Sequence, residues 1–484
     1  MLNLWTSHVR KTRSGTIFAA WMNEANALRA EDFQFGPLVS RAVAAESNDQ
    51  EDREPDDDIN DINVEWPPNP DTSIDDQWPP PDPLNDVDDP PPPPPAPKRR
   101  RSPSFDDLLA TGKPQTGNHR RRAAKRAKGI ESKGYEARAS TICDHILPAK
   151  PVPAPAFDAA DLPAAQGAYG AKVESKQEKY GHKKRRTLAE LIGLGFQVIH
   201  WNGIDARPLM DSTGRIFAVL AGQPTKDRYH EAVNRAYDFI KTQGTASCFP
   251  AAMRRHRRGL FAAINVGLTY GKGQTDPTWL DNKQYTSLAE RLLANTDIIR
   301  MANFASAAFR LWAPLLYAYY VDYNTRLAEA LSDLKRPFPK SVFSSAAFNF
   351  GPNVWTFKHR DVCNLPYGWC AVQALGRFDP TEGGHLIFWD LKMVVEFPSG
   401  ALILLPSATI AHSNIPVRDG EERVSFTQFT AGGLFRYIDN GCRTQDRLAS
   451  EDPEKFASLM KLRESRWQDG LALFSTLDEL LPDE

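Results

Sequence analysis

Three side chains in the second half of the sequence have the types and spacing of a metal site. His359 and Asp361 are two residues apart, and His412 follows Asp361 by 51 residues. The surrounding residues are apolar and aromatic and predict a strand, on which alternation places His359 and Asp361 on one face and Arg360 on the other. Two imidazoles and one carboxylate are the ligands of a non-haem Fe(II) oxygenase, which keeps positions open for a co-substrate and dioxygen.

An arginine downstream of His412 indicates the class of co-substrate. Arg423 follows His412 by eleven residues, and Asp419-Gly420 between them predicts a hairpin that makes the two near cross-strand neighbours. The guanidinium can bind the far carboxylate of a dicarboxylate through two hydrogen bonds, and Ser425 on the same face can add a hydroxyl. These residue types fit 2-oxoglutarate; the alternative is a metal-free structural barrel.

The elements that must hold these residues are short strands. From residue 343 onward the sequence becomes β-rich, with Gly, Pro and an Asp-Gly pair between the apolar runs. Seven to eight short strands joined by turns predict a jelly-roll or cupin-like barrel, that is, a double-stranded β-helix. The candidate strands are 346–357, 368–376, 385–390, 393–397, 401–405, 410–415 and 423–430.

The residues before the barrel predict further strands and the helices that support it, so the fold class is α+β. Thr187, with Glu190 three residues later, predicts the N-terminus of a helix that opens the folded block. Pro314 should kink the last and most aromatic helix. The expected strands are 196–201, 207–210, 215–220 and 260–269, and the expected helices are 227–242, 286–302 and 304–330.

Composition divides the chain of 484 residues into three regions. Residues 1–183 are expected to be largely disordered, because they are rich in Pro and charge and poor in aliphatic residues. Within them, residues 46–97 form an acidic, Pro-rich spacer and residues 130–183 a linker. Residues 184–445 are expected to form the dioxygenase domain, and residues 446–484 a helical tail.

Basic clusters favour a nucleic-acid partner and a nuclear location. Two clusters about twenty residues apart suit an import signal or a DNA-binding arm; the alternative is a solvated tract that balances the acidic one. Cations at 183–186 form a further basic patch at the edge of the domain that would hold phosphates. The cations at 254–258 favour a phosphate-contact or surface loop over a role for His256 as a metal ligand. Residues 15–28 are compatible with a docking helix or a marginal helix without function. The first of these two clusters is 98–101, and the second comprises 120–122 and 125–128.

Cysteine usage and hydropathy narrow the class of protein. The five cysteines form no CxxC pair, so neither a disulfide framework nor zinc-finger spacing is present. The apolar runs are too short to span a bilayer, and the first residues lack the apolar region of a secretory signal. We expect a soluble, monomeric intracellular protein without a membrane partner.

Residues 348–444 resemble the TET/JBP-type DNA dioxygenases, most closely the fungal branch found in basidiomycetes. These are Fe(II)/2-oxoglutarate enzymes that oxidise the methyl group of modified pyrimidines in DNA. The resemblance implies iron, 2-oxoglutarate and dioxygen, methylated double-stranded DNA as the partner, and oxidation of 5-methylcytosine to 5-hydroxymethylcytosine and beyond. It rests on HRDVCN (359–364), GGHLIFWDLK (383–392), PSATIAHSN (406–414), RVSFTQFTAGGLFRY (423–437) and GLTYGKGQ (267–274).

The resemblance also assigns the metal and co-substrate ligands. His385 matches a contact to the keto-acid end of 2-oxoglutarate; the alternative is an ordinary barrel-facing histidine. The Cys-rich zinc segment of the animal enzymes is absent, as in the compact fungal ones. The residues that match the iron ligands are His359, Asp361 and His412, and those that match the carboxylate-binding pair are Arg423 and Ser425.

Four further residues are assigned to the substrate by resemblance. Asn364 matches the asparagine that hydrogen-bonds the flipped cytosine; the alternative is a cap of the turn before Pro366. Phe429 matches an aromatic residue that stacks on that base and is usually a tyrosine in animal members. Tyr270 and Gln274 lie in a segment that resembles a loop near the DNA.

The sequence leaves three other functions open. Oxidation of N6-methyladenine would use the same metal chemistry on another base. A protein or peptide hydroxylase would use it on a side chain, although the basic segments argue against that substrate. A non-catalytic DNA-binding protein associated with a mobile element is the third alternative, and the intact ligand set argues against it.

Overall fold

The computed structural model describes residues 137–481, with four exceptions, and two short N-terminal strands. These strands, β1 (Arg10–Lys11) and β2 (Ile17–Phe18), pair antiparallel. In the stretch 15–28, the described residues are therefore strand and not helix. The acidic spacer and the basic clusters before residue 130 lie outside the described residues. The exceptions are Lys176, Tyr180, Asp227 and Lys272.

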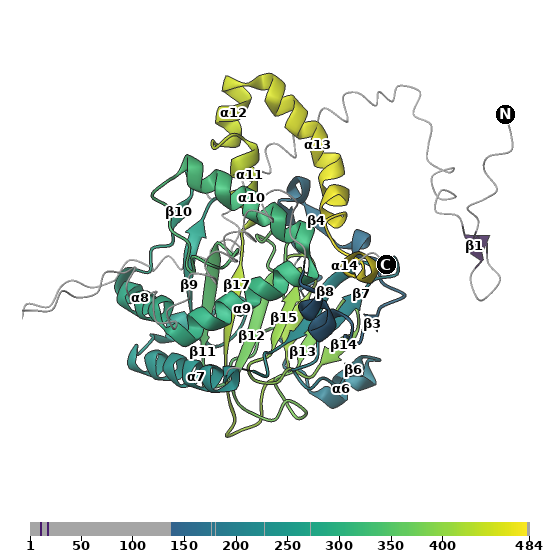
Figure 1. Cartoon of the computed structure of the whole chain (residues 1–484), viewed down its shortest axis with the longest axis vertical. Helices are drawn as coiled ribbons and strands as arrows, with labels where there is room; N and C mark the ends of the chain where they lie inside the picture. Colours follow the sequence, from purple (N-terminus) through teal and green to yellow (C-terminus); the bar gives the residue numbers. More distant parts are fainter. Residues whose placement is uncertain are drawn as a thin grey trace, which may run out of the picture. The chain divides into compact units, whose positions relative to one another are not determined.

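Two sheets form the core, and the predicted α+β double-stranded β-helix is confirmed (Figure 1). Neighbouring strands are antiparallel except in the pairs β3–β7 and β14–β6. The nine-stranded sheet has the order β10 (Thr278–Trp279), β9 (Ala262–Thr269), β11 (Ser345–Phe350), β17 (Glu422–Phe429), β12 (Cys370–Arg377), β15 (Leu402–Leu405), β8 (Ile216–Gly222), β7 (Arg207–Met210), β3 (Val152–Pro153). The four-stranded sheet has the order β16 (His412–Asn414), β13 (Leu386–Phe388), β14 (Met393–Val395), β6 (Gln197–Ile199).

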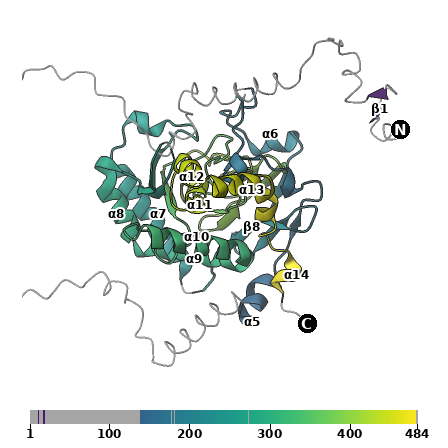
Figure 2. The same cartoon turned by 90° about the horizontal axis from the view of Figure 1, so that it is seen from above.

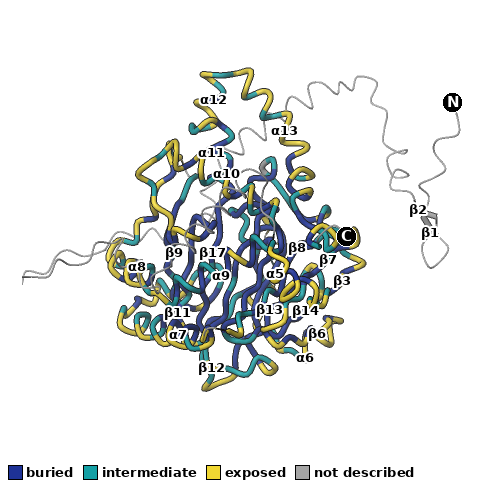
Figure 3. Tube along the Cα trace, in the orientation of Figure 1, coloured by how far each residue is buried: buried dark blue, intermediate teal, exposed yellow. Residues whose placement is uncertain are grey.

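Strand β17 shows how the larger sheet is packed on both faces. Val424 and Phe426 belong to a hydrophobic cluster with residues of several helices. These helices lie on one flank of the sheet (Figure 2). Arg423 and Ser425 alternate with them and are buried on the other face, where Arg423 Cζ lies 6.0 Å from the ring centroid of Phe397, just after β14. The strand thus presents its polar residues to the space between the sheets, where Figure 3 shows the buried residues concentrated. The helices that pack near the sheets are α7 (Tyr229–Ala246), α8 (Thr286–Ala294), α9 (Thr296–Trp312) and α10 (Pro314–Ala330).

Helix boundaries follow the capping residues more closely than the apolar pattern. Thr187 and Glu190 form the predicted capping box of α6 (Leu188–Gly193). The expected helix 286–302 is divided because Asn295 accepts hydrogen bonds from two N–H groups of the first turn of α9. Pro314 does not kink a helix but begins α10, where its missing N–H needs no partner. Within the described part of the chain, no helix has the length and apolar character to cross a membrane.

Residues 137–175, which composition assigns to a linker, pack against the barrel. Ile142, Val152 and Tyr169 are buried in the same core as the strands of the larger sheet. Trp467 Nε1 donates to a backbone carbonyl of this segment at 2.9 Å. Its few apolar residues are spaced too widely for a periodic signal, so only tertiary contacts reveal its order. The short elements are α5 (Ala139–Thr141), η1 (Ile142–Ile146), η2 (Ala159–Asp161), β4 (Ala164–Ala165), η3 (Gln166–Ala168) and β5 (Gly170–Ala171), and the last helices are α11 (Gly432–Asp439), α12 (Gln445–Glu451), α13 (Pro453–Leu471) and α14 (Leu477–Leu480).

One glycine lets β12 and β17 approach at the position of Arg423. Gly376 pairs with Arg423, has φ of +152°, and a Cβ there would lie 2.0 Å from the carbonyl oxygen of Glu422. Gly376→Ala is expected to lower the free energy of unfolding by about 3 kcal/mol, because the clash is with backbone that cannot rotate away. Gly420→Ala is the control: Gly420 has φ of +86° and no atom within 4 Å of an added Cβ, so about 1 kcal/mol is expected. Urea unfolding measures both, and equal losses would contradict the packing argument.

Candidate metal and co-substrate site

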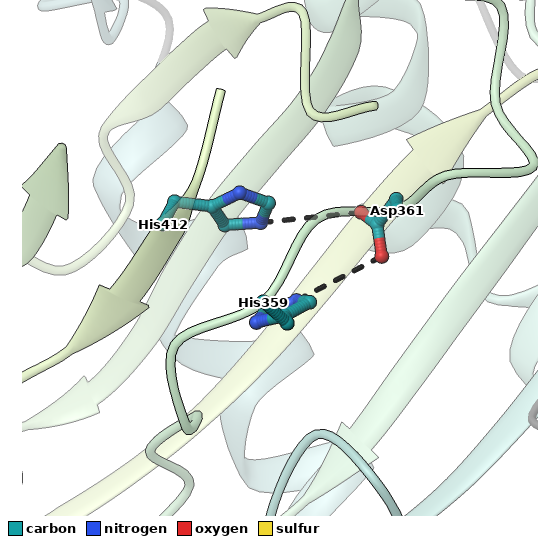
Figure 4. A group of neighbouring side chains, drawn as sticks. All are labelled: His359, Asp361 and His412. Atoms are coloured by element: carbon teal, nitrogen blue, oxygen red, sulfur yellow. Dashed lines mark ion pairs between the residues drawn. The ribbon is translucent and has the colours of Figure 1, made fainter. Parts of the chain in front are cut away.

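The three predicted metal ligands converge on one point. The ligand atoms of His359, Asp361 and His412 all lie within 4.8 Å of one another (Figure 4). His359 Nε2 lies 3.7 Å from Asp361 Oδ1, and His412 Nε2 lies 3.9 Å from Asp361 Oδ2. Separations of this size leave room for an ion between the ligand atoms, which would bind each of them at about 2 Å.

Backbone carbonyls fix the orientation of both imidazoles. Nδ1 of His359 lies 2.8 Å from the carbonyl oxygen of Phe357, and Nδ1 of His412 lies 2.9 Å from that of Ile410. Because a carbonyl can only accept, each Nδ1 carries the proton and each Nε2 keeps its lone pair free on the side of Asp361. This is the usual outer support of a metal-binding histidine.

The charge state of the three groups also suits a metal. Burial lowers the pKa of His359 well below its ordinary value, and His412 lowers it further. Burial likewise lowers the pKa of His412. Burial alone would raise the pKa of Asp361, but Arg258 and the two imidazoles together hold it below its usual range. Neutral imidazoles and an ionised carboxylate are the forms that bind a metal.

The segment that carries His359 and Asp361 is not the predicted strand. Strand β11 ends at Phe350, and residues 351–369 are irregular with isolated bridges. His359 and His412 exchange backbone hydrogen bonds of 3.0 and 2.9 Å, whereas the N–H of Asp361 donates to the carbonyl of Ser407 at 2.9 Å. The backbone donors of this segment therefore bond to several separate segments and not to one neighbouring strand. Tertiary contacts, and not strand alternation, bring the two ligands together.

A cation that the sequence did not single out contacts the metal site. Arg258 Nη2 lies 3.1 Å from Asp361 Oδ1. The basic run 254–258 is thus not only a surface loop, and one of its members forms an ion pair with a candidate metal ligand. His256 packs edge-on against Phe261, with ring centroids 4.7 Å apart, and is not in the ligand cluster. No local pattern could reveal this role of Arg258, because its partner lies 103 residues away.

Arg258→Gln is expected to weaken metal binding by about 10- to 100-fold, the usual effect of losing a group that orients a ligand. Titration of the apoprotein with Mn(II), followed by electron paramagnetic resonance, measures the affinity. Arg255→Gln is the matched control, since Arg255 is exposed in the same basic run. A metal affinity that is the same in both variants would remove Arg258 from the site.

The predicted co-substrate arginine is buried without an acidic partner. Arg423 is 1% exposed, and its Nη1 donates to the carbonyl of Val354 at 2.8 Å. Its Nε has no hydrogen-bond partner, and no ion pair involves it among the described residues. Burial lowers its pKa to about 10, so it remains charged at neutral pH. An arginine in this state is a site for a carboxylate that enters from outside.

The predicted hairpin between His412 and Arg423 is wrong. Strand β16 pairs with β13 in the four-stranded sheet, whereas β17 pairs with β11 and β12 in the other. The turn around Asp419-Gly420 crosses from one sheet to the other, as successive strands do in a jelly roll. Ser425 does share the face of Arg423, and its Oγ accepts a hydrogen bond from Asn349 Nδ2 at 2.8 Å.

His385 is buried and neutral but is not connected to the three ligands. Neither ring nitrogen has a hydrogen-bond partner in the described structure. Burial lowers its pKa to about 4. The charged groups that act on it are Glu396, His200 and Asp379, none of which belongs to the ligand cluster.

Of the predicted base-contact residues, Asn364 contacts Asp361, whereas Phe429 packs in a small hydrophobic cluster. The N–H of Asn364 donates to the carbonyl of Asp361 at 2.8 Å, and its Nδ2 donates to Ser407 Oγ at 3.1 Å. Phe429 packs with Cys370. Burial raises the pKa of the Cys370 thiol, and the charge of Asp361 raises it further.

The other two predicted contacts lie together in the loop after β9. The Tyr270 ring packs edge-on against Tyr437, with centroids 4.9 Å apart. Gln274 Nε2 donates to Thr278 Oγ1 at 2.8 Å. No contact joins either residue to the metal ligands among the described residues.

Comparison with known proteins gives distant structural matches. No protein-family model matches the sequence, and no curated protein matches it. NgTET1 in complex with 5mC DNA matches at TM-score 0.35 and 12% identity over 49% of this chain and 83% of that one. A viral collagen prolyl hydroxylase from Paramecium bursaria Chlorella virus 1, in complex with 2-oxoglutarate, matches at TM-score 0.15 and 16% identity. This match covers 18% of this chain and 57% of that one. A 2OG-Fe(II) oxygenase from Burkholderia pseudomallei matches at TM-score 0.22 and 15% identity. This match covers 40% of this chain and 76% of that one. At TM-scores and identities this low, function has to be inferred from the geometry of this chain's own residues.

Proposed function

We propose that this chain is an Fe(II)/2-oxoglutarate-dependent dioxygenase that oxidises a methylated base in DNA, with 5-methylcytosine as the substrate. The observation that carries the proposal is the pairing of two features inside one barrel. His359, Asp361 and His412 form a candidate set of three protein ligands, and Arg423 is a buried cation that has no carboxylate partner among the described residues. A metal ion would fill the ligand set, and 2-oxoglutarate would supply a carboxylate to Arg423.

The donor set fits iron and its co-substrate. Two neutral imidazoles and one carboxylate on one side of a metal match the ligands of non-haem Fe(II) oxygenases and leave positions for a chelating keto acid. Arg423 and Ser425 would bind the far carboxylate of 2-oxoglutarate and so orient the keto-acid end toward His359 and His412. When bound, iron with 2-oxoglutarate and dioxygen supplies an oxidant strong enough to attack a methyl C–H bond.

The protein's own residues would position the ligands and the substrate. The carbonyls of Phe357 and Ile410 hold the imidazoles in one tautomer, and Arg258 holds one oxygen of Asp361. The buried setting would keep water away from the reacting methyl group.

DNA as the substrate is supported by the residues beside the ligands and by the resemblance of the sequence. A base inside a duplex cannot reach a buried metal, so the nucleotide must be flipped out. Asn364, adjacent to Asp361, would hydrogen-bond the flipped base, and Phe429 would stack on it. Tyr270 and Gln274 would contact the duplex from the loop after β9. His385 would assist at the keto-acid end.

Product analysis tests the proposed function. The protein is incubated with Fe(II), 2-oxoglutarate, ascorbate and a duplex that carries 5-methylcytosine, and the DNA is then digested to nucleosides for mass spectrometry. We expect 5-hydroxymethylcytosine and further oxidised forms, and none when 2-oxoglutarate is left out. A parallel duplex with N6-methyladenine and a proline-rich peptide serve as competing substrates. Succinate release that only the adenine duplex or the peptide stimulates would overturn the choice of substrate.

A further inference from the structure

A cavity of about 350 Å³ lies beside the metal site. Its lining comes from a first segment, Glu174, Lys179 and residues 181–184, from a second segment, residues 357–360 and Val362, and from Arg257. His359 lines this cavity, whereas Asp361 and His412 do not. The cavity is therefore a neighbour of the metal position and not the metal position itself.

Contacts fix the first segment across the second. The carbonyl of His182 accepts a hydrogen bond from the N–H of Lys358 at 3.2 Å. Glu174 forms an ion pair with Arg360. Nη2 of Arg360 also lies 2.7 Å from Oδ1 of Asp390. Glu174 and His182 thus attach the first segment to the loop that carries His359.

Positive charge dominates the walls of the cavity. Six lysines and arginines line it against a single carboxylate, Glu174. That carboxylate is already neutralised by Arg360 and lies 3.4 Å from the ring of His182. The cationic residues are Lys179, Lys183, Lys184, Arg257, Lys358 and Arg360.

Two of these cations have no partner among the carboxylates that line the cavity. Lys183 is exposed and has no ion-pair partner among the described residues. Lys184 pairs only with Glu190, at 3.3 Å, and both side chains are about half exposed, so this surface pair contributes little and is readily exchanged. A concave cluster of cations that exceeds its acids concentrates anions.

We propose that this cavity is a phosphate subsite, which holds a backbone phosphate of the nucleic-acid strand next to the nucleotide that enters the metal site. The inference rests on the proposed function for the nature of the strand. A flipped nucleotide keeps its covalent link to the phosphates on either side, so a strand presented to the metal places a phosphate within a nucleotide's length of it. Lysines act on phosphate as mobile point charges, which suits a wall that must accept more than one strand geometry.

Anisotropy binding of a fluorescent methylated duplex to the full chain tests the subsite. The variant Lys183→Glu with Lys184→Glu is compared with Lys335→Glu with Lys461→Glu, two exposed lysines elsewhere, which alter net charge equally. We expect affinity to fall about tenfold in the first variant and by less than about twofold in the second. The magnitude of the slope of log affinity against log salt should fall by about one in the first variant only. A complex that lacks one phosphate contact releases about one counterion fewer when it forms.

Duplexes with a single uncharged methylphosphonate linkage locate the phosphate. Replacing one linkage beside the methylated cytosine should weaken wild-type binding and have no further effect on the Lys183→Glu, Lys184→Glu variant. The subsite would be overturned if every methylphosphonate linkage weakened binding by the same factor in the wild type and in the Lys183→Glu, Lys184→Glu variant. It would also be overturned if the two charge variants lost the same affinity for the unmodified duplex. So would displacement of the duplex by polyglutamate of equal charge at the same concentration, which would indicate an acidic peptide instead. The assay needs neither metal nor 2-oxoglutarate, so a protein that passes it yet oxidises no base would overturn the proposed function alone.

Discussion

Replacing His412 by alanine is expected to abolish 2-oxoglutarate turnover, with a loss of at least about 100-fold. Removal of a group that only orients a ligand already weakens a metal site by about 10- to 100-fold, and His412 supplies one of three ligands. Its ring is held by the carbonyl of Ile410 and faces Asp361, so no other imidazole in the cluster can replace it. Succinate release measures turnover, and metal content after dialysis measures binding.

Ser413→Ala is the matched control for His412→Ala. Ser413 is the next residue of β16 and accepts a hydrogen bond from Trp389 Nε1 at 2.9 Å, so its side chain serves packing away from the ligands. The control should keep its metal and its turnover. A His412→Ala protein that retains iron and releases succinate at the control's rate would remove His412 from the site.

Arg423→Met is expected to raise the dissociation constant of 2-oxoglutarate by about 100-fold, or about 3 kcal/mol, because it removes a buried charge that pairs with a carboxylate. The same substitution should leave the ligand-free protein as stable as the wild type or more stable. Arg423 is 1% exposed and has no acidic partner in the described structure, and an unpaired buried charge destabilises a fold. Thermal unfolding with and without 2-oxoglutarate measures both effects in one experiment.

Arg377→Met separates this effect from the general loss of an arginine. Arg377 lies on the neighbouring strand β12 and forms an exposed ion pair with Asp238 at 2.8 Å, which contributes at most about 1 kcal/mol. This control should bind 2-oxoglutarate normally. A large loss of stability in Arg423→Met without loss of 2-oxoglutarate affinity would make Arg423 a structural residue.

The parts of the site that the sequence predicted are those encoded by residue type and by regular alternation. The ligand types of His359, Asp361 and His412 needed no structure, and the shared face of Arg423 and Ser425 follows from the period of β17. Strand alternation predicted that His359 and Asp361 lie together, and they do, but tertiary contacts place them there because their segment is irregular.

The parts that the sequence missed depend on contacts between distant segments. Arg258 acts on Asp361 across 103 residues. The crossing of the chain between sheets after β16 cannot be told from a hairpin by turn residues alone. Residues 137–175 have the composition of a linker, yet a few widely spaced apolar side chains bury themselves in the core. Local propensity predicts neither the Arg258 contact, nor the crossing between sheets, nor the order of residues 137–175, because each depends on tertiary packing.

Anaerobic calorimetric titration of 2-oxoglutarate tests most directly whether the ligand cluster and Arg423 form one co-substrate site. Mn(II)-loaded protein should bind one equivalent per chain, because His359, Asp361 and His412 would hold a metal that binds one end of the molecule while Arg423 would bind the other. Metal-free wild type and the Mn(II)-loaded His412→Ala variant should each bind it at least about tenfold more weakly. Equal affinity of 2-oxoglutarate with and without metal would contradict the account, because the two halves of the site would then not be bridged by one ligand.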